Sequence, residues 1–294
     1  MPAPIRLSRF AFVAAGAVAL AACAAASPEP VVAQPSRFIP AVAPQPTYVD
    51  LIEMVRNSSI IARVAIDEQI TVPADRAPGV AFGHSRIYVE SLTQALIGGN
   101  VPVGGQMTFV ADVPVNPDGK PPRLDKLDDP SFIVFARPAG SRPGEVQLTG
   151  PMAMQPATFE LEERVREVLR QLAEGVLPPR ITGVREAISI AGNLAGESET
   201  QIFLETDNGA PVSLNVLRRP GQSPRWGVSW TEIVDQAARA PQPETLQWYG
   251  LACFLPSELP DDAFLQDDRE AQRRARADYA VILDDLGPCG RNTG

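Results

Sequence analysis

The sequence contains little of the chemistry on which catalytic and metal sites depend. Its 294 residues include one histidine, three cysteines and two lysines, and 6% are aromatic. Zinc sites need three or four ligands, mostly Cys and His, so we expect no zinc centre. A Ser-His-Asp triad would have to use His84, yet the chain has no Gly-x-Ser-x-Gly nucleophile elbow. We interpret His84 as a surface loop residue and predict no catalytic residue, no metal and no cofactor.

Motifs for phosphate, calcium and nucleic acid are missing as well. Gly98-Gly99 and Gly104-Gly105 bracket a turn, but no Gly-Lys-Ser/Thr follows them, which excludes a phosphate loop. The acidic runs Asp125–Asp129 and Asp261–Asp268 match no EF-hand, so we expect solvated loops there. The net charge is −9, and an acidic protein is a poor partner for nucleic acid.

The apolar run from Phe10 to Ala22 is too short to cross a membrane. It has 13 residues without a charge, whereas a spanning helix needs about 20. Arg6 and Arg9 precede the run and small residues end it, which is the pattern of a secretory signal peptide. We therefore expect residues 1–22 to be a signal peptide that is removed.

The run ends in Leu20-Ala21-Ala22-Cys23, which resembles the lipobox of bacterial lipoproteins. The resemblance implies that Cys23 becomes the first mature residue and carries a diacylglyceryl thioether and an acylated amine. Several acyl chains give stable anchoring, at about 0.8 kcal/mol for each buried methylene. By the same resemblance, Ala24 in place of an aspartate implies the outer membrane, facing the periplasm. The alternative is an ordinary signal peptide whose cleavage site contains a cysteine.

Cys253 and Cys289 remain once Cys23 is assigned to lipid. In an oxidising periplasm, two remaining cysteines most simply form a disulfide. A metal pair would need further Cys or His nearby, and a redox pair is usually Cys-x-x-Cys. Closing a loop of this size would stabilise the fold by roughly 3–4 kcal/mol. We predict a structural disulfide between Cys253 and Cys289.

The first half of the chain predicts a small β-barrel. Residues 23–46, rich in Ala and Pro, predict an extended tether without a core. Thr47 and Asp50 fit a capping box that starts a helix. Short β-rich runs then follow at 60–66, 86–92, 106–110, 131–136 and 145–148. With an amphipathic helix at 160–174, this order indicates a barrel with flanking helices over residues 47–177.

Part of this half resembles a known fold. A helix and a strand precede Val-Glu-x-Leu-x-x-x-Leu-x-Gly-Gly at 89–99, Val-x-Val-Gly-Gly at 101–105 and Phe-Ile-Val-Phe-Ala at 132–136. This order resembles the netrin-like and TIMP-like OB-type barrels over residues 47–150, which implies an OB-like barrel. The cysteines of the eukaryotic members are missing. TIMP inhibitors act through a free N-terminal cysteine amine, so that mechanism does not carry over to a lipidated Cys23.

Leu177-Pro178-Pro179 marks the predicted boundary to a second domain, residues 178–294. A hairpin signal, Asp207-Asn208-Gly209, separates two of its strands. The predicted elements are strands at 199–206, 212–217 and 225–230 and helices from the capping box at 229–232 to before Pro241, at 244–255 and at 271–286. We therefore predict an α+β fold, in which a C-terminal antiparallel sheet is packed with helices.

Trp226 and Trp230 share parity on the third of these strands, so both would face the same side of the sheet. Burial in the core is one interpretation of this pair. The other is an exposed aromatic patch for a glycan or protein partner, with a polar rim of Arg218, Arg219 and Arg225.

These features predict a lipid-anchored, non-enzymatic protein of the bacterial cell envelope with a binding or accessory role. Its partners would be the membrane, through the lipid on Cys23, and an envelope protein or glycan. The alternative is a periplasmic hydrolase that uses a pair of carboxylates. A third hypothesis, an inhibitor or chaperone of another envelope enzyme, follows from the OB-type resemblance alone.

Overall fold

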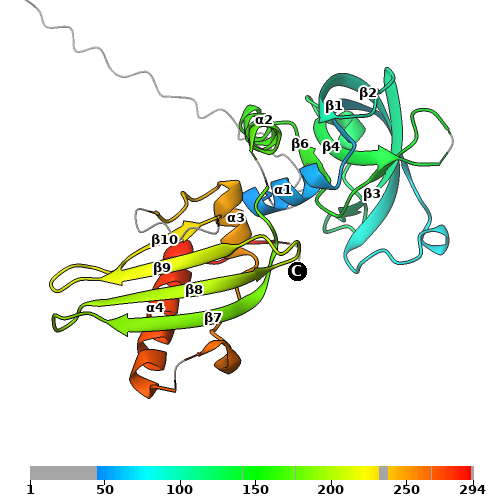
Figure 1. Ribbon diagram of the computed structural model, residues 1–294. Coiled ribbons are helices and arrows are strands. Elements are labelled where there is room, and N and C mark those ends of the chain that lie inside the picture. Colours follow the sequence, from blue (N-terminus) through cyan, green and yellow to red (C-terminus); the bar gives the residue numbers. More distant parts are fainter. Residues whose placement is uncertain (1–44, 141, 176, 232–237, 266, 293–294) are drawn as a thin grey trace, which may run out of the picture. The chain divides into compact units, whose positions relative to one another are not determined.

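The computed structural model describes residues 45–292 except 141, 176, 232–237 and 266. The predicted signal peptide, the lipid site Cys23 and most of the predicted tether lie outside the described residues. Within them the fold is α+β, with a six-stranded and a four-stranded antiparallel sheet and four α-helices (Figure 1). No described helix is both long enough and apolar enough to span a membrane.

The six-stranded sheet follows helix α1, Tyr48–Arg56. Thr47 caps this helix as predicted, because its hydroxyl accepts the Asp50 N–H while the Asp50 carboxylate accepts the Thr47 N–H. The strands are β1 (Ile60–Thr71), β2 (His84–Gly99), β3 (Gln106–Pro114), β4 (Ser131–Pro138), β5 (Val146–Leu148) and β6 (Met154–Pro156). They pair in the order β3-β2-β1-β4-β5, and β6 pairs with β4. Alternate apolar residues of the long strands form one core.

The predicted OB-like barrel is not closed, since no sheet closes within the described residues. β3 and the segment before β5 meet at an isolated bridge between Thr108 and Glu145, and the Thr108 N–H donates to the Gly144 carbonyl at 2.9 Å. β5 has three residues against nine in β3, too few for a continuous ladder between them. The two edges of the sheet therefore approach each other without closing.

Gly98 and Gly99 end β2, where they pair with β1, and the connection to β3 lies between them and Gly104-Gly105, as predicted. Gly98 lies beneath α2, Phe159–Glu174, the helix expected in this region. A Cβ at Gly98 would come within 2.7 Å of the Leu169 side chain of that helix. The missing side chain thus lets the helix and the sheet pack closely.

The second half forms the four-stranded sheet, in the order β10-β9-β8-β7. Its strands are β7 (Ile181–Ala191), β8 (Ser198–Thr206), β9 (Val212–Arg218) and β10 (Arg225–Ser229). The last three match the predicted strands, whereas β7 is not expected from the pattern. Two register shifts, one on each side of Val184, interrupt the alternation of β7 and hide it from a search for period two.

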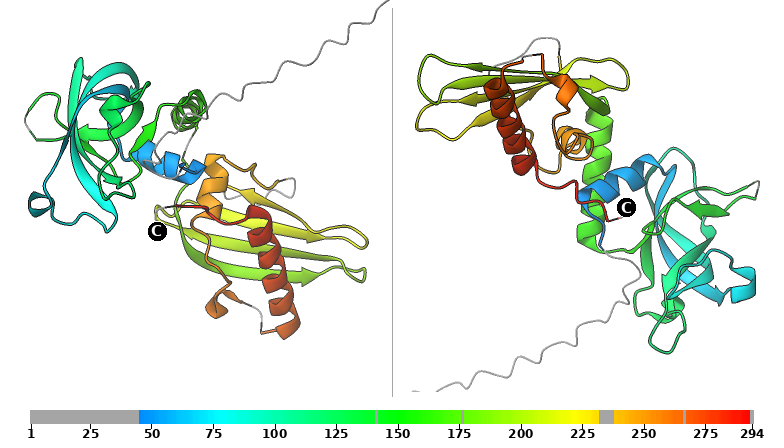
Figure 2. Two further views of the ribbon diagram at one scale, coloured as in Figure 1. Left: turned by 180° about the vertical axis from the view of Figure 1, so that it is seen from behind. Right: turned by 90° about the horizontal axis from the view of Figure 1, so that it is seen from below.

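Two helices pack against one face of this sheet (Figure 2). α4, Arg269–Leu286, contributes Tyr279 and Ile282 to the core that it shares with the strands. α3, Leu246–Ala252, is shorter than predicted and contributes Leu251 to the same core. The helix predicted to start at 229–232 falls largely on residues 232–237, which lie outside the described residues.

Cys253, at the C-cap of α3, forms the predicted disulfide with Cys289, which follows α4. The two Cα atoms are 4.7 Å apart, and the cysteines are separated by 36 positions. The bond therefore ties the chain beyond α4 to α3. From there Arg291 reaches Glu53 of α1, with which it forms an ion pair.

Candidate functional site

The two tryptophans of the predicted patch pack on helices of this half rather than lying in solvent, Trp226 on α4 and Trp230 beside Gly250 of α3. Trp226 is 9% exposed, and its indole N–H donates to the Asp285 carboxylate of α4 at 2.7 Å. Trp230 is half-buried and packs against the same core. Both rings therefore belong to the packing between the four-stranded sheet and its helices.

Arg218 of the predicted rim also serves the fold. It pairs with Asp278, whose side chain is completely buried on the apolar face of α4, and the Thr200 hydroxyl donates to the same carboxylate. A buried carboxylate is costly without a cation and hydrogen bonds, so Arg218 holds this face of α4 to the sheet.

Arg219 and Arg225 lie instead around a small cavity of about 290 Å³, together with Arg239. We call this cavity the arginine pocket. Its lining residues are Asn215, Leu217, Arg219, Gln222, Ser223, Arg225, Trp226, Ala238 and Arg239. Three of the five predicted patch residues thus line one cavity, while Arg218 and Trp230 do not.

The turn of the β9–β10 hairpin brings two of the arginines to this cavity. β9 ends just before Arg219, the Gln222 N–H donates to the Arg219 carbonyl at 3.1 Å, and β10 begins at Arg225. Gly221 adopts a φ of 71°, which favours glycine. Arg219 and Arg225 therefore flank the same short turn.

Arg239 reaches the pocket from beyond β10. The Val228 N–H of this edge strand donates to the Arg239 carbonyl at 3.4 Å. Gly227 allows that approach, since a Cβ there would collide with the backbone of Ala238. A side chain at position 227 would displace the segment that carries Arg239.

The arginine pocket concentrates positive charge in an acidic protein. All three arginines are exposed, and in the part of the chain that the structure describes none of them forms an ion pair. No Asp or Glu is among the described lining residues. The chain as a whole carries a net charge of −9, so this excess of cations is local.

This arrangement is suited to binding one anionic group. Guanidinium groups bind carboxylates and phosphates through paired N–H donors. The Gln222 amide and the Ser223 hydroxyl add neutral donors to the lining. The volume is at the lower limit of small-molecule sites, which take about 300–1,000 Å³. The pocket therefore fits an anionic group presented by a larger partner better than a large organic ligand.

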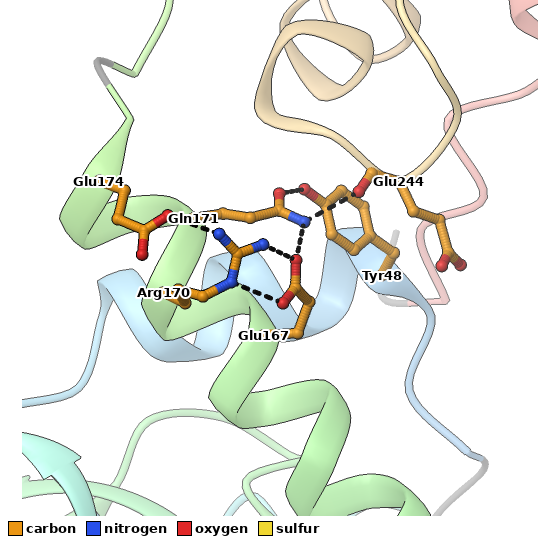
Figure 3. A network of polar contacts seen from close by, with 6 residues as sticks. All are labelled: Tyr48, Glu167, Arg170, Gln171, Glu174 and Glu244. Carbon is orange, nitrogen blue, oxygen red and sulfur yellow. Dashed lines mark hydrogen bonds and ion pairs between the residues drawn. The ribbon is translucent and has the colours of Figure 1, made fainter.

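A second cluster of polar groups joins α1, α2 and the segment before α3 (Figure 3). The Tyr48 hydroxyl donates to the Gln171 side-chain oxygen at 2.6 Å. The Gln171 amide donates to the Glu167 carboxylate at 2.9 Å and to the Glu244 carbonyl at 3.2 Å. We call this cluster the α2 network, and it comprises Tyr48, Glu167, Arg170, Gln171, Glu174 and Glu244.

The arginine of the α2 network is matched by acids. Arg170 pairs with both Glu167 and Glu174, and its hydrogen bonds lower the pKa of the Glu167 carboxyl. Burial, aided by the charges of Glu244 and Glu167, raises the pKa of the Tyr48 phenol. We interpret the network as a contact that holds three elements together.

His84 and one aspartate of each acidic run make polar contacts within the fold. His84 is the first residue of β2 and is exposed, and its Nδ1 lies 3.2 Å from the Phe82 carbonyl. Asp125 and Asp261, one from each acidic run, are both ion-paired. Among the residues that the structure describes, no group of three or more His, Cys, Asp and Glu side chains could hold a metal ion.

No family model matches this chain, and no curated protein matches it. The arginine pocket is therefore assigned from its geometry. Sequence reasoning identified Arg219 and Arg225 but missed Gln222, Ser223 and Arg239. The first two missed residues lie in the hairpin turn, where the turn signal could have indicated them. Arg239 belongs to a distant segment, and only the three-dimensional fold places it here.

Proposed function

We propose that this protein is a lipid-anchored protein of the bacterial cell envelope that binds an anionic partner in the arginine pocket without catalysing a reaction. The sequence Leu20-Ala21-Ala22-Cys23 supports the anchor, with the lipid on Cys23. The disulfide between Cys253 and Cys289 is compatible with an oxidising compartment. The proposed location is the outer membrane, facing the periplasm.

The positive charge of the arginine pocket, for which the described residues provide no carboxylate partner, carries this proposal. Three guanidinium groups surround one small cavity, although acidic residues outnumber Lys and Arg in the chain, 35 to 26. Such a site attracts a carboxylate or a phosphate. Proteins and glycans of the envelope are the proposed partners, because both classes can present a single group of this kind at their surface.

For the six-stranded sheet we propose a relationship to the OB-type folds. The strand order β3-β2-β1-β4-β5 and the bridge between Thr108 and Glu145 support it, since the outer strands approach each other as in a partly open barrel. This proposal concerns the architecture and assigns no activity to the sheet.

Inorganic phosphate and acetate are suitable probes of the arginine pocket, observed through the arginine Nε–H signals in NMR titrations. We expect both ions to shift the signals of Arg219, Arg225 and Arg239. The double variant Arg225→Gln/Arg239→Gln should bind phosphate at least about tenfold more weakly, since charged hydrogen bonds are lost. Arg166→Gln removes an arginine that is ion-paired with Glu162 and should bind as the unmodified protein does. Unchanged binding by the double variant would refute the site.

The anchor is tested by the intact mass of detergent-extracted protein beside a Cys23→Ala variant. We expect the mature form to start at Cys23 with added acyl mass, and the variant to lack this mass. An unlipidated, freely soluble protein would refute the anchor and would leave the anion-binding proposal to be tested on its own.

A hydrolase, the alternative function, would need two carboxylates free to act on one substrate. The described lining of the arginine pocket contains no carboxylate. In a larger cavity at α1 and α3, Glu53 is ion-paired with Arg291, and the Asp207 carboxylate accepts a backbone N–H. Neither of these two cavities offers two free carboxylates among its described lining residues, so for them we prefer the binding function.

A further inference from the structure

A larger cavity, of about 680 Å³, lies between the C-terminal end of α1, α3 and the segment that leads into β7. We call it the α1–α3 cavity. Its volume is within the range of about 300–1,000 Å³ typical of small-molecule sites. Pro178 and Phe254 contribute apolar surface, and Arg56 and Arg180 contribute charge. The cavity shares no lining residue with the arginine pocket.

The charges that line this cavity do not cancel. Glu53 is ion-paired with Arg291, whose Nε lies 3.0 and 3.1 Å from the two carboxylate oxygens. The Asp207 carboxylate accepts the backbone N–H of Arg180, at 3.2 Å, and makes no ion pair with its guanidinium. Within the described residues, neither Arg56 nor Arg180 is ion-paired, and both are exposed. Arg56 also hydrogen-bonds with the Tyr249 phenol. Neither guanidinium has a described carboxylate partner, so both can bind an external anion.

Aromatic side chains hold Arg180 in position. Its guanidinium carbon lies 5.0 Å from the centroid of the Phe254 ring, and Phe254 meets Tyr249 edge to face at 5.4 Å. Tyr249 is buried, and burial raises the pKa of its phenol, which therefore stays neutral. A guanidinium stacked on a ring keeps its N–H edge free to bind a carboxylate.

We propose that the α1–α3 cavity is a second binding site, for an organic acid whose carboxylate binds Arg56 and Arg180 while its apolar body packs on Pro178 and Phe254. The cavity is more than twice the volume of the arginine pocket and has apolar surface from which a bare anion gains nothing. Arg291 contributes to the preference for an acid, because it neutralises Glu53, which would otherwise repel a carboxylate.

N-acetylphenylalanine, as its carboxylate, and N-acetylphenylalaninamide are matched probes of this site in the full-length protein. Isothermal titration calorimetry should show the carboxylate binding about tenfold more tightly than the amide, since only the carboxylate makes charged hydrogen bonds. Arg180→Gln should abolish this difference, and Phe254→Leu should weaken the binding of both probes. Arg166→Gln, which removes an ion-paired arginine of α2 outside both cavities, is the control and should leave both affinities unchanged.

Three results would each overturn the proposal: binding of neither probe at about 10 mM, equal affinity for both probes, or an unchanged preference in Arg180→Gln. Thermal unfolding establishes that each variant is folded. If Arg180→Gln does not fold, Arg56→Gln takes its place with the same expected loss of preference. The phosphate titration reports on different residues, so failure of this site and failure of the arginine pocket are distinguishable.

Discussion

The α2 network and the arginine pocket use the same kind of side chain to opposite effect. Arg170 meets two carboxylates of its own helix, and Gln171 links one of them to Tyr48. Arg225 and Arg239 line a cavity whose described lining includes no acid. A charge that is matched internally helps to hold the fold, whereas an unmatched charge in a concave site is available to a partner. The difference distinguishes contacts that stabilise the protein from contacts that bind.

Variants of Arg218 and Arg219, which are neighbours in the chain, test this distinction. Here we expect the largest effect, a change in the free energy of unfolding. Arg218→Gln leaves the buried Asp278 carboxylate without its cation, so we expect the free energy of unfolding to fall by about 3 kcal/mol. Arg219→Gln removes an exposed charge and should change it by less than about 0.5 kcal/mol. Urea unfolding followed by circular dichroism measures both variants. Equal losses would contradict the assignment of Arg218 to the fold and Arg219 to the pocket.

Charge reversal in the pocket should alter binding without altering stability. We expect Arg225→Glu to lower the affinity for inorganic phosphate more than about tenfold, because repulsion replaces attraction. Arg170→Gln in the α2 network should show the reverse, with unchanged phosphate affinity and a loss of less than about 1 kcal/mol in the free energy of unfolding. NMR titration and urea unfolding of both variants provide the measurement. Phosphate binding that weakens equally in the two variants would argue for a general charge effect.

Tyr48→Phe should weaken the α2 network by a single hydrogen bond. The hydroxyl donates to Gln171 at 2.6 Å, so we expect the free energy of unfolding to fall by about 1 kcal/mol. Tyr88→Phe is the matched control: Tyr88 is half-buried in β2, and its hydroxyl makes no hydrogen bond within the described residues. The same urea experiment compares the two. A loss in Tyr88→Phe as large as that in Tyr48→Phe would show that the network hydrogen bond adds nothing measurable.

The smallest effect concerns alkaline pH. Burial raises the pKa of the Tyr48 and Tyr279 phenols above the ordinary value of about 10. Above that pH the unfolded chain releases phenolic protons that the folded chain retains. Stability is therefore unaffected below about pH 10 and falls as the pH rises further. At about pH 10.5 we expect a loss below about 1 kcal/mol for each phenol.

Ultraviolet absorbance during an alkaline titration measures the ionisation of the phenols. Tyr48→Phe should remove one of the phenols that ionise above the ordinary pH. The arginine pocket contains no tyrosine among its described lining residues. The affinity for phosphate should therefore not change with the ionisation of these phenols. Ionisation of every phenol at about pH 10 in the folded protein would contradict the burial argument.

Elements that depend on neighbouring residues could be predicted from the sequence. The capping box at Thr47 and the turn at Asp207-Asn208-Gly209 are local signals, and the structure has the helix and the hairpin that they indicate. β7 was not predicted, because its register shifts around Val184 interrupt the alternation of apolar and polar residues. Whether the predicted barrel closes depends on how far β5 pairs with β3, which no local pattern specifies.

For the arginine pocket, too, only the part that depends on neighbouring residues could be predicted from the sequence. Arg219 and Arg225 flank a recognisable hairpin turn. Arg239 reaches the pocket only because the backbone of its segment packs closely against Gly227. The different roles of Arg218 and Arg219 depend on Asp278, which is 60 positions after Arg218 and lies on another element. Parity on a strand indicates which residues share a face. It does not indicate which face a helix will cover.

Asn292 lies beside Gln45, the first described residue. Its side-chain amide donates to the Gln45 carbonyl at 3.1 Å and to the Asp50 carboxylate at 3.0 Å. A short linker from residue 292 to residue 45 would therefore make the described chain circular, and the circle could be reopened at the exposed turn around Gly221. Such a permutant should keep both sheets and the Cys253–Cys289 bond, and it would carry the arginine pocket at its new ends.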